Sequence, residues 1–286
     1  MSEPKIAFIG GSGLYDIDGL KAREEVMPDT PYGAPSDSIV IGALDGVGVA
    51  FLPRHGKGHR FSPTELPYHA NIYALKSLGV EQIISISAVG SLKEDIKPLD
   101  LLIPDQLIDR TRSRSNTFFG NGIVAHVGFA DPFCPALSDV LARSAADQDV
   151  KVHKGGTYVV MEGPQFSTRA ESELYRSWGA SVIGMTALPE AKLAREAEIC
   201  YATLALVTDY DVWHQTEEEV SVEIVIANLM QNVGTSRRII TDVANRAPKV
   251  RECVCESALE NAIITSREHI REESKRKLGP LVRRYL

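Results

Sequence analysis

The apolar and polar positions of the chain follow two periods, one typical of buried strands and one typical of amphipathic helices. Short apolar runs predict strands at residues 5–9, 82–88, 99–103, 156–160, 181–183 and 200–207. Helical spacing predicts helices at residues 64–78, 136–146, 168–178, 189–197, 217–243 and 253–277. This alternation, without repeats or a linker, predicts a single α/β domain over residues 1–286, with a central mixed β-sheet flanked by helices. Residues from about 249 to 286 are expected to form its C-terminal helical tail.

Turn signals add detail to this pattern. Asp45-Gly46 separates two strand-like runs, which predicts a β-hairpin. Thr168 stands before a helical stretch and Glu171 follows three residues later, the pattern of a capping box. Residues 106–119 are polar and are expected to form a loop.

Composition and charge argue against some classes of function. Of the 286 residues, 44% are hydrophobic and 24% are charged, as in an ordinary globular domain with a sizeable core. The net charge of -7 argues against a nucleic-acid partner, which requires a basic surface. No apolar run reaches membrane-spanning length, so no membrane partner is expected, and the acidic first residues do not suggest a signal peptide.

The cysteines point to a reducing compartment. The chain has four, and they are too few and too far apart for the disulfide framework of a small secreted domain. They are Cys134, Cys200, Cys253 and Cys255. We therefore expect a cytoplasmic location.

Polar residues follow several of the predicted strands, at the edge where open α/β sheets bind ligands. A glycine-rich turn that contains Ser12 follows the first strand; it suits an anion, although a tight turn explains its glycines equally well. Arg54, His55 and His59 crowd into the loop after the hairpin. A solvated basic loop is the ordinary interpretation of any one of them, but their clustering favours an oxyanion site.

Further anion-binding groups are predicted at two other segments. Ser87 and Ala88 end a buried strand, and Thr186 stands just before a helix N-terminus, where free N–H groups favour an anion. These groups and those near Ser12 and Arg54 are predicted to converge on one phosphate.

The stretch from Gly184 to Trp213 ends in two carboxyl groups, those of Asp209 and Asp211, directly after a buried strand. Carboxylates would repel a phosphate, so they are expected to face the opposite, uncharged end of the same ligand. Phe166 follows a Gly-Pro turn, which is no core setting, and so is a candidate to stack on a flat ring.

These segments together resemble the purine nucleoside phosphorylase family, in particular its trimeric class that cleaves S-methyl-5'-thioadenosine. The similarity extends from Ile6 to about Ala244, and the combination and order of the motifs are highly specific. The motifs are IGGSGL, PRHGKGH, SAVGSL, DPFCP, EGPQFSTRAE, GMTALPE and AREAEICYATLALVTDYD.

The resemblance implies a pentosyltransferase of purine and methionine salvage. Inorganic phosphate would cleave 5'-methylthioadenosine to adenine and 5-methylthio-D-ribose 1-phosphate, in a homotrimer that needs no metal and no organic cofactor. The implied phosphate-binding residues are Ser12, Arg54, His55, Ser87, Ala88 and Thr186. The implied nucleoside-binding residues are Met185, Asp209, Asp211, Phe166, His126 and Val222.

The same resemblance gives these residues particular roles. Met185 would lie against the ribose and Phe166 would stack on the base. His126 and Val222 would line the 5'-alkylthio end, with His126 supplied by a neighbouring subunit. At Gly184 some relatives have Asn, so base specificity here is expected to rest more heavily on the aspartates.

The chemistry of the reaction suggests separate roles for the two aspartates. Adenine leaves readily only if its N7 takes a proton, and Asp209, kept protonated by its surroundings, is the predicted donor. Asp211 would accept hydrogen bonds from the 6-amino group. A 6-oxopurine would set oxygen against carboxylate, which argues against the nearest alternative, a 6-oxopurine or methylthioinosine phosphorylase.

A nucleotide-binding oxidoreductase is a more distant alternative. It is disfavoured because the first glycine turn lacks the G-x-G-x-x-G spacing and no acidic residue closes a βαβ unit. The pair Cys253 and Cys255 stands apart from the site. Some relatives bridge such a C-x-C pair, but the ring is strained, and two free thiols on a helix are the favoured interpretation.

Overall fold

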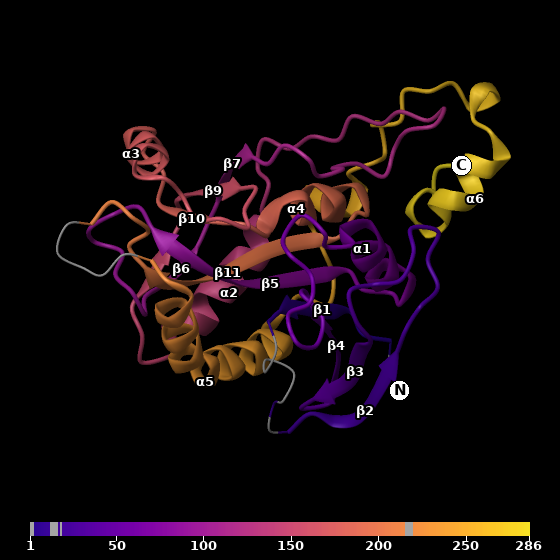
Figure 1. Ribbon diagram of the computed structural model, residues 1–286. Helices are drawn as coiled ribbons and strands as arrows, with labels where there is room; N and C mark the ends of the chain where they lie inside the picture. The colour runs from indigo at the N-terminus through magenta and orange to yellow at the C-terminus, as the bar shows by residue number, and fades with distance from the viewer. Residues whose placement is uncertain (1–2, 12–16, 18, 215–219) are drawn as a thin grey trace.

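A large mixed sheet forms the centre of the protein in this computed structural model, which describes residues 3–11, 17, 19–214 and 220–286 (Figure 1). Its main path runs β2-β3-β4-β1-β5-β10-β9-β7, and β11, β6 and β8 branch from β5. The strands are β1 (Ile6–Gly10), β2 (Lys21–Val26), β3 (Ile39–Leu44), β4 (Val47–Pro53), β5 (Gln82–Ser91), β6 (Leu101–Ile103), β7 (Gln106–Arg110), β8 (Val152–Lys154), β9 (Thr157–Met161), β10 (Val182–Gly184) and β11 (Cys200–Asp209).

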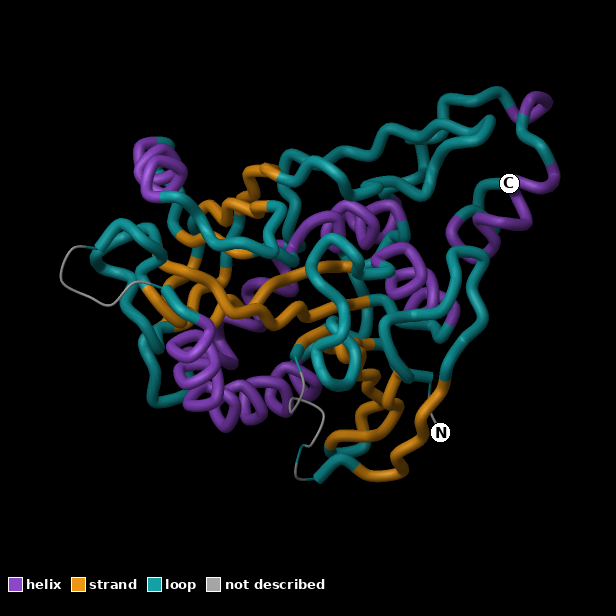
Figure 2. The backbone as a smooth tube through the Cα atoms, viewed as in Figure 1, coloured by secondary structure: helices purple, strands orange, loops and turns teal. Residues whose placement is uncertain are grey.

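Helices cover both faces of the sheet (Figure 2). The α-helices are α1 (Tyr68–Ser77), α2 (Pro135–Ala146), α3 (Arg169–Ser177), α4 (Ala187–Glu196), α5 (Val222–Arg246) and α6 (Glu272–Leu278). The 3-10 helices are η1 (Val254–Ser257), η2 (Arg267–His269) and η3 (Gly279–Leu281). Within the described residues, no helix is both long and apolar enough to cross a membrane.

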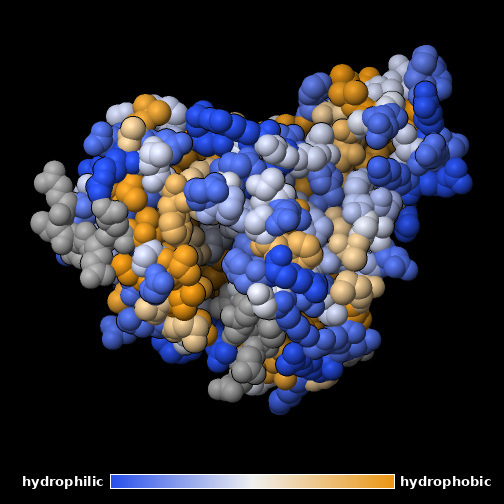
Figure 3. All heavy atoms as spheres, viewed as in Figure 1, coloured by the Kyte–Doolittle hydropathy of each residue, from blue (hydrophilic) through white to orange (hydrophobic). Residues whose placement is uncertain are grey.

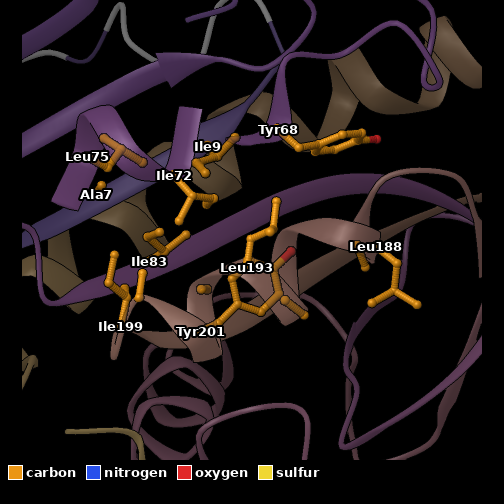
Figure 4. Packing of buried hydrophobic residues seen from close by; sticks show 14 of the residues in the cluster. Ala7, Ile9, Tyr68, Ile72, Leu75, Ile83, Leu188, Leu193, Ile199 and Tyr201 are labelled. Carbon is orange, nitrogen blue, oxygen red and sulfur yellow. The ribbon is translucent and has the colours of Figure 1, made fainter. Parts of the chain in front are cut away.

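Alternate side chains of the central strands point to opposite faces of the sheet. Both sets are buried because helices cover both faces. In β1, Ala7 and Ile9 pack in one core cluster with residues of α1 and α4, whereas Ile6 and Phe8 pack in a second cluster with residues of α2 and α5. Figure 4 shows the first cluster, in which Ile9 and side chains of α1 and α4 meet over the sheet. Full burial of each large apolar side chain contributes roughly 1.5–3 kcal/mol.

The pairing of the central strands creates the ligand-binding edge. β1 is parallel to β4 and β5, and β5 is parallel to β11, so the carboxyl ends of four strands lie at one edge. The register of β5 and β11 shifts between Val207 and Asp209, where Asp209 comes opposite Gly90. This bulge turns the end of β11 out of the regular ladder.

Most of the predicted elements are confirmed. β3 and β4 form the hairpin, and Asp45 and Gly46 have the positive φ angles of 48° and 86° that such a turn requires. The capping box of α3 is present, with Thr168 and Glu171 each bonded to the backbone of the other. The helix predicted from residue 64 begins only at Tyr68, because the preceding proline disfavours helical backbone before it.

The predicted loop at residues 106–119 was partly wrong. Its first residues form β7, which pairs in parallel with β9 at the edge of the sheet. β2 was missed for a similar reason, since its side chains are almost all exposed. Edge strands are held by backbone hydrogen bonds and need no apolar alternation.

The long helix predicted at residues 253–277 was also wrong. The segment folds into η1, η2 and α6, joined by extended chain that runs beside a loop near residue 125 (Figure 1). Ala125 pairs with Ile263, and the N–H of His126 donates to the carbonyl of Ala262 at 2.8 Å. Some backbone N–H and C=O groups of this segment therefore form hydrogen bonds with the loop and not within a helix.

Candidate active site

Two of the predicted phosphate-binding hydroxyls meet at the ligand-binding edge. Ser87 Oγ of β5 lies 3.0 Å from Thr186 Oγ1, and both residues are buried. Thr186 is the N-cap residue of α4, yet its hydroxyl makes no capping hydrogen bond. Two hydroxyls so close together in β5 and at the start of α4 can both donate to one oxyanion, although the backbone of α4 is non-helical at Leu188. Ala88, the next residue of β5, is half-buried.

Arg54 is buried beside β5, where its guanidinium is paired with the carboxylate of Glu190. Its Nε lies 2.8 Å from Oε1 of Glu190 in α4, and its Nη2 lies 3.1 Å from Oε2. Nη1 donates to the carbonyl of Ile86 at 2.9 Å, and Nη2 donates to Ser85 Oγ at 2.6 Å. The guanidinium thus joins the end of β4 to β5 and α4, and most of its N–H groups bind the protein. Glu190 was not predicted as a site residue, although the motif GMTALPE places it in the first turn of a predicted helix.

His55 is held as a neutral ring. Its Nδ1 lies 2.9 Å from the carbonyl of Phe61, which can only accept, so Nδ1 carries the hydrogen. The ring stacks on His59 with 4.1 Å between centroids. Burial lowers the pKa of His55 to about 4, which leaves Nε2 as a lone-pair acceptor at neutral pH. Such a ring can accept a hydrogen bond from a protonated phosphate oxygen.

The two aspartates lie together at the bulged end of β11. Asp211 N–H donates to Asp209 Oδ1 at 2.8 Å, and Thr208 Oγ1 donates to Asp209 Oδ2 at 2.7 Å. Burial raises the pKa of Asp209 to about 6. Burial also raises the pKa of Asp211, whose Oδ1 accepts from Ser167 Oγ at 3.1 Å. Among the described residues, Asp211 Oδ2 is buried without a hydrogen bond of good geometry, and the buried hydroxyl of Ser172 lies near this carboxyl group.

Gly90 makes room for the aspartates. A Cβ at this position would lie 2.8 Å from Asp209 Oδ1 and 3.3 Å from Asp211 Cβ. Any larger residue in β5 would therefore displace the carboxyl groups. Gly90 was not predicted as a site residue, although it is the glycine of the motif SAVGSL.

Met185 and Phe166 come from neighbouring loops. A Cβ at Gly163 would meet the side chain of Met185, so the Gly163 turn packs directly on it. The buried Arg114 donates to the carbonyls of both Leu188 and Glu162, which joins the two loops. Arg114 lies in the segment predicted to be a loop, and this role was not predicted. Phe166 is 39% exposed and so is not a core residue.

The other predicted residues lie further from this centre. Val222 is exposed in the first turn of α5, shortly after Val220, whose N–H donates to the carbonyl of Asp211. His126 is exposed on the loop that the C-terminal segment holds, and no described contact joins it to the aspartates. Ser12 lies outside the described residues. The assignments of His126, Val222 and Ser12 therefore stay predictions.

The site has one end for an anion and another for a polar, uncharged group. The face seen in Figure 3 is hollowed beside α5, and apolar side chains gather along that hollow. Buried hydroxyls and Arg54 form one end of the site, and the Asp209–Asp211 pair forms the other. Between them lies the segment of Gly184 and Met185, which connects β10 to α4.

Known proteins resemble this chain over nearly its whole length. A sequence model of the phosphorylase superfamily matches residues 5–245. The chain is 56% identical to the S-methyl-5'-thioadenosine phosphorylase of Geobacter sulfurreducens, over 99% of this chain and 100% of the relative. It is 57% identical to the enzyme of that name from Thermosynechococcus vestitus, over 99% of each chain.

Solved structures lead to the same group. The crystal structure of a methylthioadenosine phosphorylase from an Antarctic soil metagenomic library matches with a TM-score of 0.94 and 53% identity, over 98% of this chain and 99% of the other. The Schistosoma mansoni methylthioadenosine phosphorylase in complex with adenine matches with a TM-score of 0.81 and 37% identity, over 85% and 91% of the two chains. The chain belongs to the phosphorylase superfamily, and within it to the family of the S-methyl-5'-thioadenosine phosphorylases.

Proposed function

We propose that this protein catalyses the phosphorolysis of 5'-methylthioadenosine, giving adenine and 5-methylthio-D-ribose 1-phosphate. The observation that carries the proposal is the pairing of two unlike ends at one edge of the sheet. At one end, Ser87 and Thr186 present hydroxyls 3.0 Å apart beside a buried arginine. At the other end, Asp209 has a pKa of about 6 and so can carry a proton.

The reaction forms one bond and breaks one bond at C1' of the ribose. A phosphate oxygen attacks C1' while the C1'–N9 bond breaks and its electron pair passes to the purine. Positioning of phosphate under the sugar replaces a bimolecular collision, and the anion stabilises the oxocarbenium-like transition state. Asp209 donates its proton to N7, so adenine leaves as a neutral molecule, and the carboxylate takes a proton from solvent afterwards.

Asp211 is proposed to recognise the 6-amino group. Its buried Oδ2 has no hydrogen bond of good geometry among the described residues, so a ligand N–H would remove the cost of an unsatisfied acceptor. A 6-oxopurine would bring a second acceptor to this oxygen. The pair of carboxyl groups therefore favours adenine nucleosides over inosine.

We also propose that the active protein is a cytoplasmic homotrimer of purine and methionine salvage that uses phosphate as co-substrate and no metal or organic cofactor in the reaction. His126 supports the assembly proposal, because the loop that carries it is exposed and lies apart from the rest of this chain's site. In a trimer this loop would complete the 5' end of a neighbouring site. Analytical ultracentrifugation tests the assembly, and His126→Ala should raise KM for methylthioadenosine more than KM for adenosine.

The decisive experiment follows adenine release from methylthioadenosine with and without phosphate. Adenine release that requires phosphate, and is faster with methylthioadenosine and adenosine than with inosine, supports the proposal. Phosphate-independent release, or a preference for inosine, contradicts it.

A further inference from the structure

All four cysteines of the chain meet at one place, although they come from three distant segments. The sulfur atoms of Cys134, Cys200, Cys253 and Cys255 all lie within 4.8 Å of one another. Cys134 stands before α2, Cys200 begins β11, and the other two flank the start of η1. The spacing of the cysteines along the sequence did not predict this cluster, because the fold brings together segments that are far apart in the chain.

The backbone holds this cluster without help from the thiols. The N–H of Cys134 donates to the carbonyl of Tyr201 at 2.8 Å, and the N–H of Cys200 donates to the carbonyl of Glu81 at 2.9 Å. In the C-terminal segment, the N–H of Glu256 donates to the carbonyl of Cys253 at 3.2 Å. Backbone hydrogen bonds therefore help to hold the four sulfur atoms close together before any disulfide or metal–sulfur bond forms.

The spacing of the sulfur atoms identifies the kind of ligand. All four cysteines are free thiols, and Cys200 Sγ and Cys253 Sγ lie 3.3 Å apart, well beyond the roughly 2.05 Å of a disulfide. Zn–S bonds of about 2.3 Å in a tetrahedron place the sulfur atoms about 3.8 Å apart. We propose that Cys134, Cys200, Cys253 and Cys255 bind one Zn²⁺ ion as a tetrathiolate structural site.

The surroundings suit the charge of such a site. Binding releases the thiol protons to solvent, and four thiolates around Zn²⁺ carry a net charge of -2. The guanidinium of Arg251 lines the same surface pocket as Cys134, Cys200 and Cys253, and places a positive charge near them. Cys134 is the N-cap residue of α2, where the positive end of the helix dipole favours a thiolate.

A metal ion can reach the cluster from solvent. A surface pocket of about 300 Å³ is lined by three of the cysteines, Cys134, Cys200 and Cys253, together with Arg251. Among the described residues, no other group of His, Cys, Asp and Glu offers a comparable set of ligands.

The proposed zinc is structural and takes no part in the proposed phosphorolysis. Cys200 and Asp209 are at opposite ends of β11, about 30 Å apart at roughly 3.3 Å per residue. Four protein ligands also leave no open coordination position for a substrate. The ion would fasten the C-terminal segment to α2 and β11, in addition to the apolar packing of Cys255 against residues of both elements.

Metal analysis of the protein as purified in the presence of Zn²⁺ and a reductant tests the proposal. We expect one zinc ion per chain by mass spectrometry, and a lower unfolding temperature after removal of the metal with a chelator. Replacement of the zinc by Co²⁺ should give the intense visible bands of a tetrahedral site and a thiolate-to-metal charge-transfer band. Less than a tenth of a metal ion per chain, with four reactive thiols, would overturn the proposal.

A pair of variants separates the metal site from general effects on the C-terminal segment. Cys255→Ser removes one ligand, whereas Val254→Ser changes the exposed residue between the two cysteines. We expect Cys255→Ser to lose its zinc and Val254→Ser to keep it. A chelator should therefore lower the unfolding temperature of Val254→Ser but not that of Cys255→Ser. If Cys255→Ser does not fold, the stoichiometry and cobalt spectrum of the unaltered protein still decide. Thiols are also counted in denatured, unreduced protein. Fewer than four thiols in protein that holds no metal would show disulfides and would contradict the zinc site.

Discussion

The phenol of Tyr158 occupies the space that a side chain at residue 184 would need. A Cβ at Gly184 would fall on the Tyr158 hydroxyl and would lie 3.0 Å from its Cζ. Tyr158 is fully buried in β9, so the ring has no room to withdraw. A side chain at residue 184 therefore has no room beside this tyrosine of the neighbouring strand.

Gly184→Ala should be destabilising and should impair turnover. The added methyl group forces Tyr158 or the loop of Met185 and Thr186 to move, and overpacking of this kind typically costs about 1–3 kcal/mol. Gly128→Ala is the matched control, since nothing lies within 4 Å of a Cβ there. Thermal unfolding and steady-state kinetics of the two variants check this prediction, and equal effects would contradict it.

Tyr158→Leu should rescue a side chain at residue 184. The shorter side chain vacates the space beside Gly184, so the double variant Tyr158→Leu, Gly184→Asn should be more active than Gly184→Asn alone. A double-mutant cycle on kcat/KM measures the coupling. Additive losses would show that the two residues do not compete for one space.

Asp209→Asn should lower kcat with methylthioadenosine by about 10²- to 10⁴-fold, because an amide cannot supply the proton that N7 requires. KM should change less, since the amide still occupies the same space. Asp139→Asn, at a half-exposed carboxylate of α2 paired with Lys154, is the control and should leave kcat unchanged. Near-normal turnover of Asp209→Asn would mean that another group protonates the base.

The pH profile should show a falling alkaline limb. Burial raises the pKa of Asp209 from 3.8 to about 6, so the protonated, active form is present below about pH 6 and is lost as the pH rises through that value. With phosphate held saturating, kcat/KM for methylthioadenosine should therefore decrease above about pH 6, or somewhat higher if the bound anion raises the pKa further. A profile that is flat between about pH 5 and pH 8 would be inconsistent with this donor.

Glu190→Ala should destabilise the protein far more than the loss of a surface carboxylate. The Arg54–Glu190 pair is almost fully buried, with side chains 2% and 1% exposed, and an unpaired buried charge costs about 3–5 kcal/mol. The Asp147–Arg246 pair has a similar N···O distance, 2.6 Å, but is largely exposed, so Asp147→Ala should cost no more than about 1 kcal/mol. Chemical denaturation of both variants checks the difference.

Local sequence patterns were enough to predict the elements whose structure depends only on neighbouring residues. The hairpin at Asp45-Gly46 and the capping box at Thr168 depend on residues a few positions apart, and both are confirmed. The central strands were predicted because β5 and β11 are buried on both faces and rich in apolar residues. The edge strands β2 and β7 were not, because their side chains are mostly exposed and give no apolar signal.

The sequence by itself determined the fold class, the family motifs and the residue types at the site, since these depend on composition, period and order along the chain. Only the tertiary structure decided which distant groups meet: Arg54 with Glu190, Gly184 with Tyr158, and four cysteines from three segments around one point. The physical reason is that these contacts join residues 26 to 136 positions apart, and their closeness depends on strand register and helix packing. No local pattern in the chain records either of these.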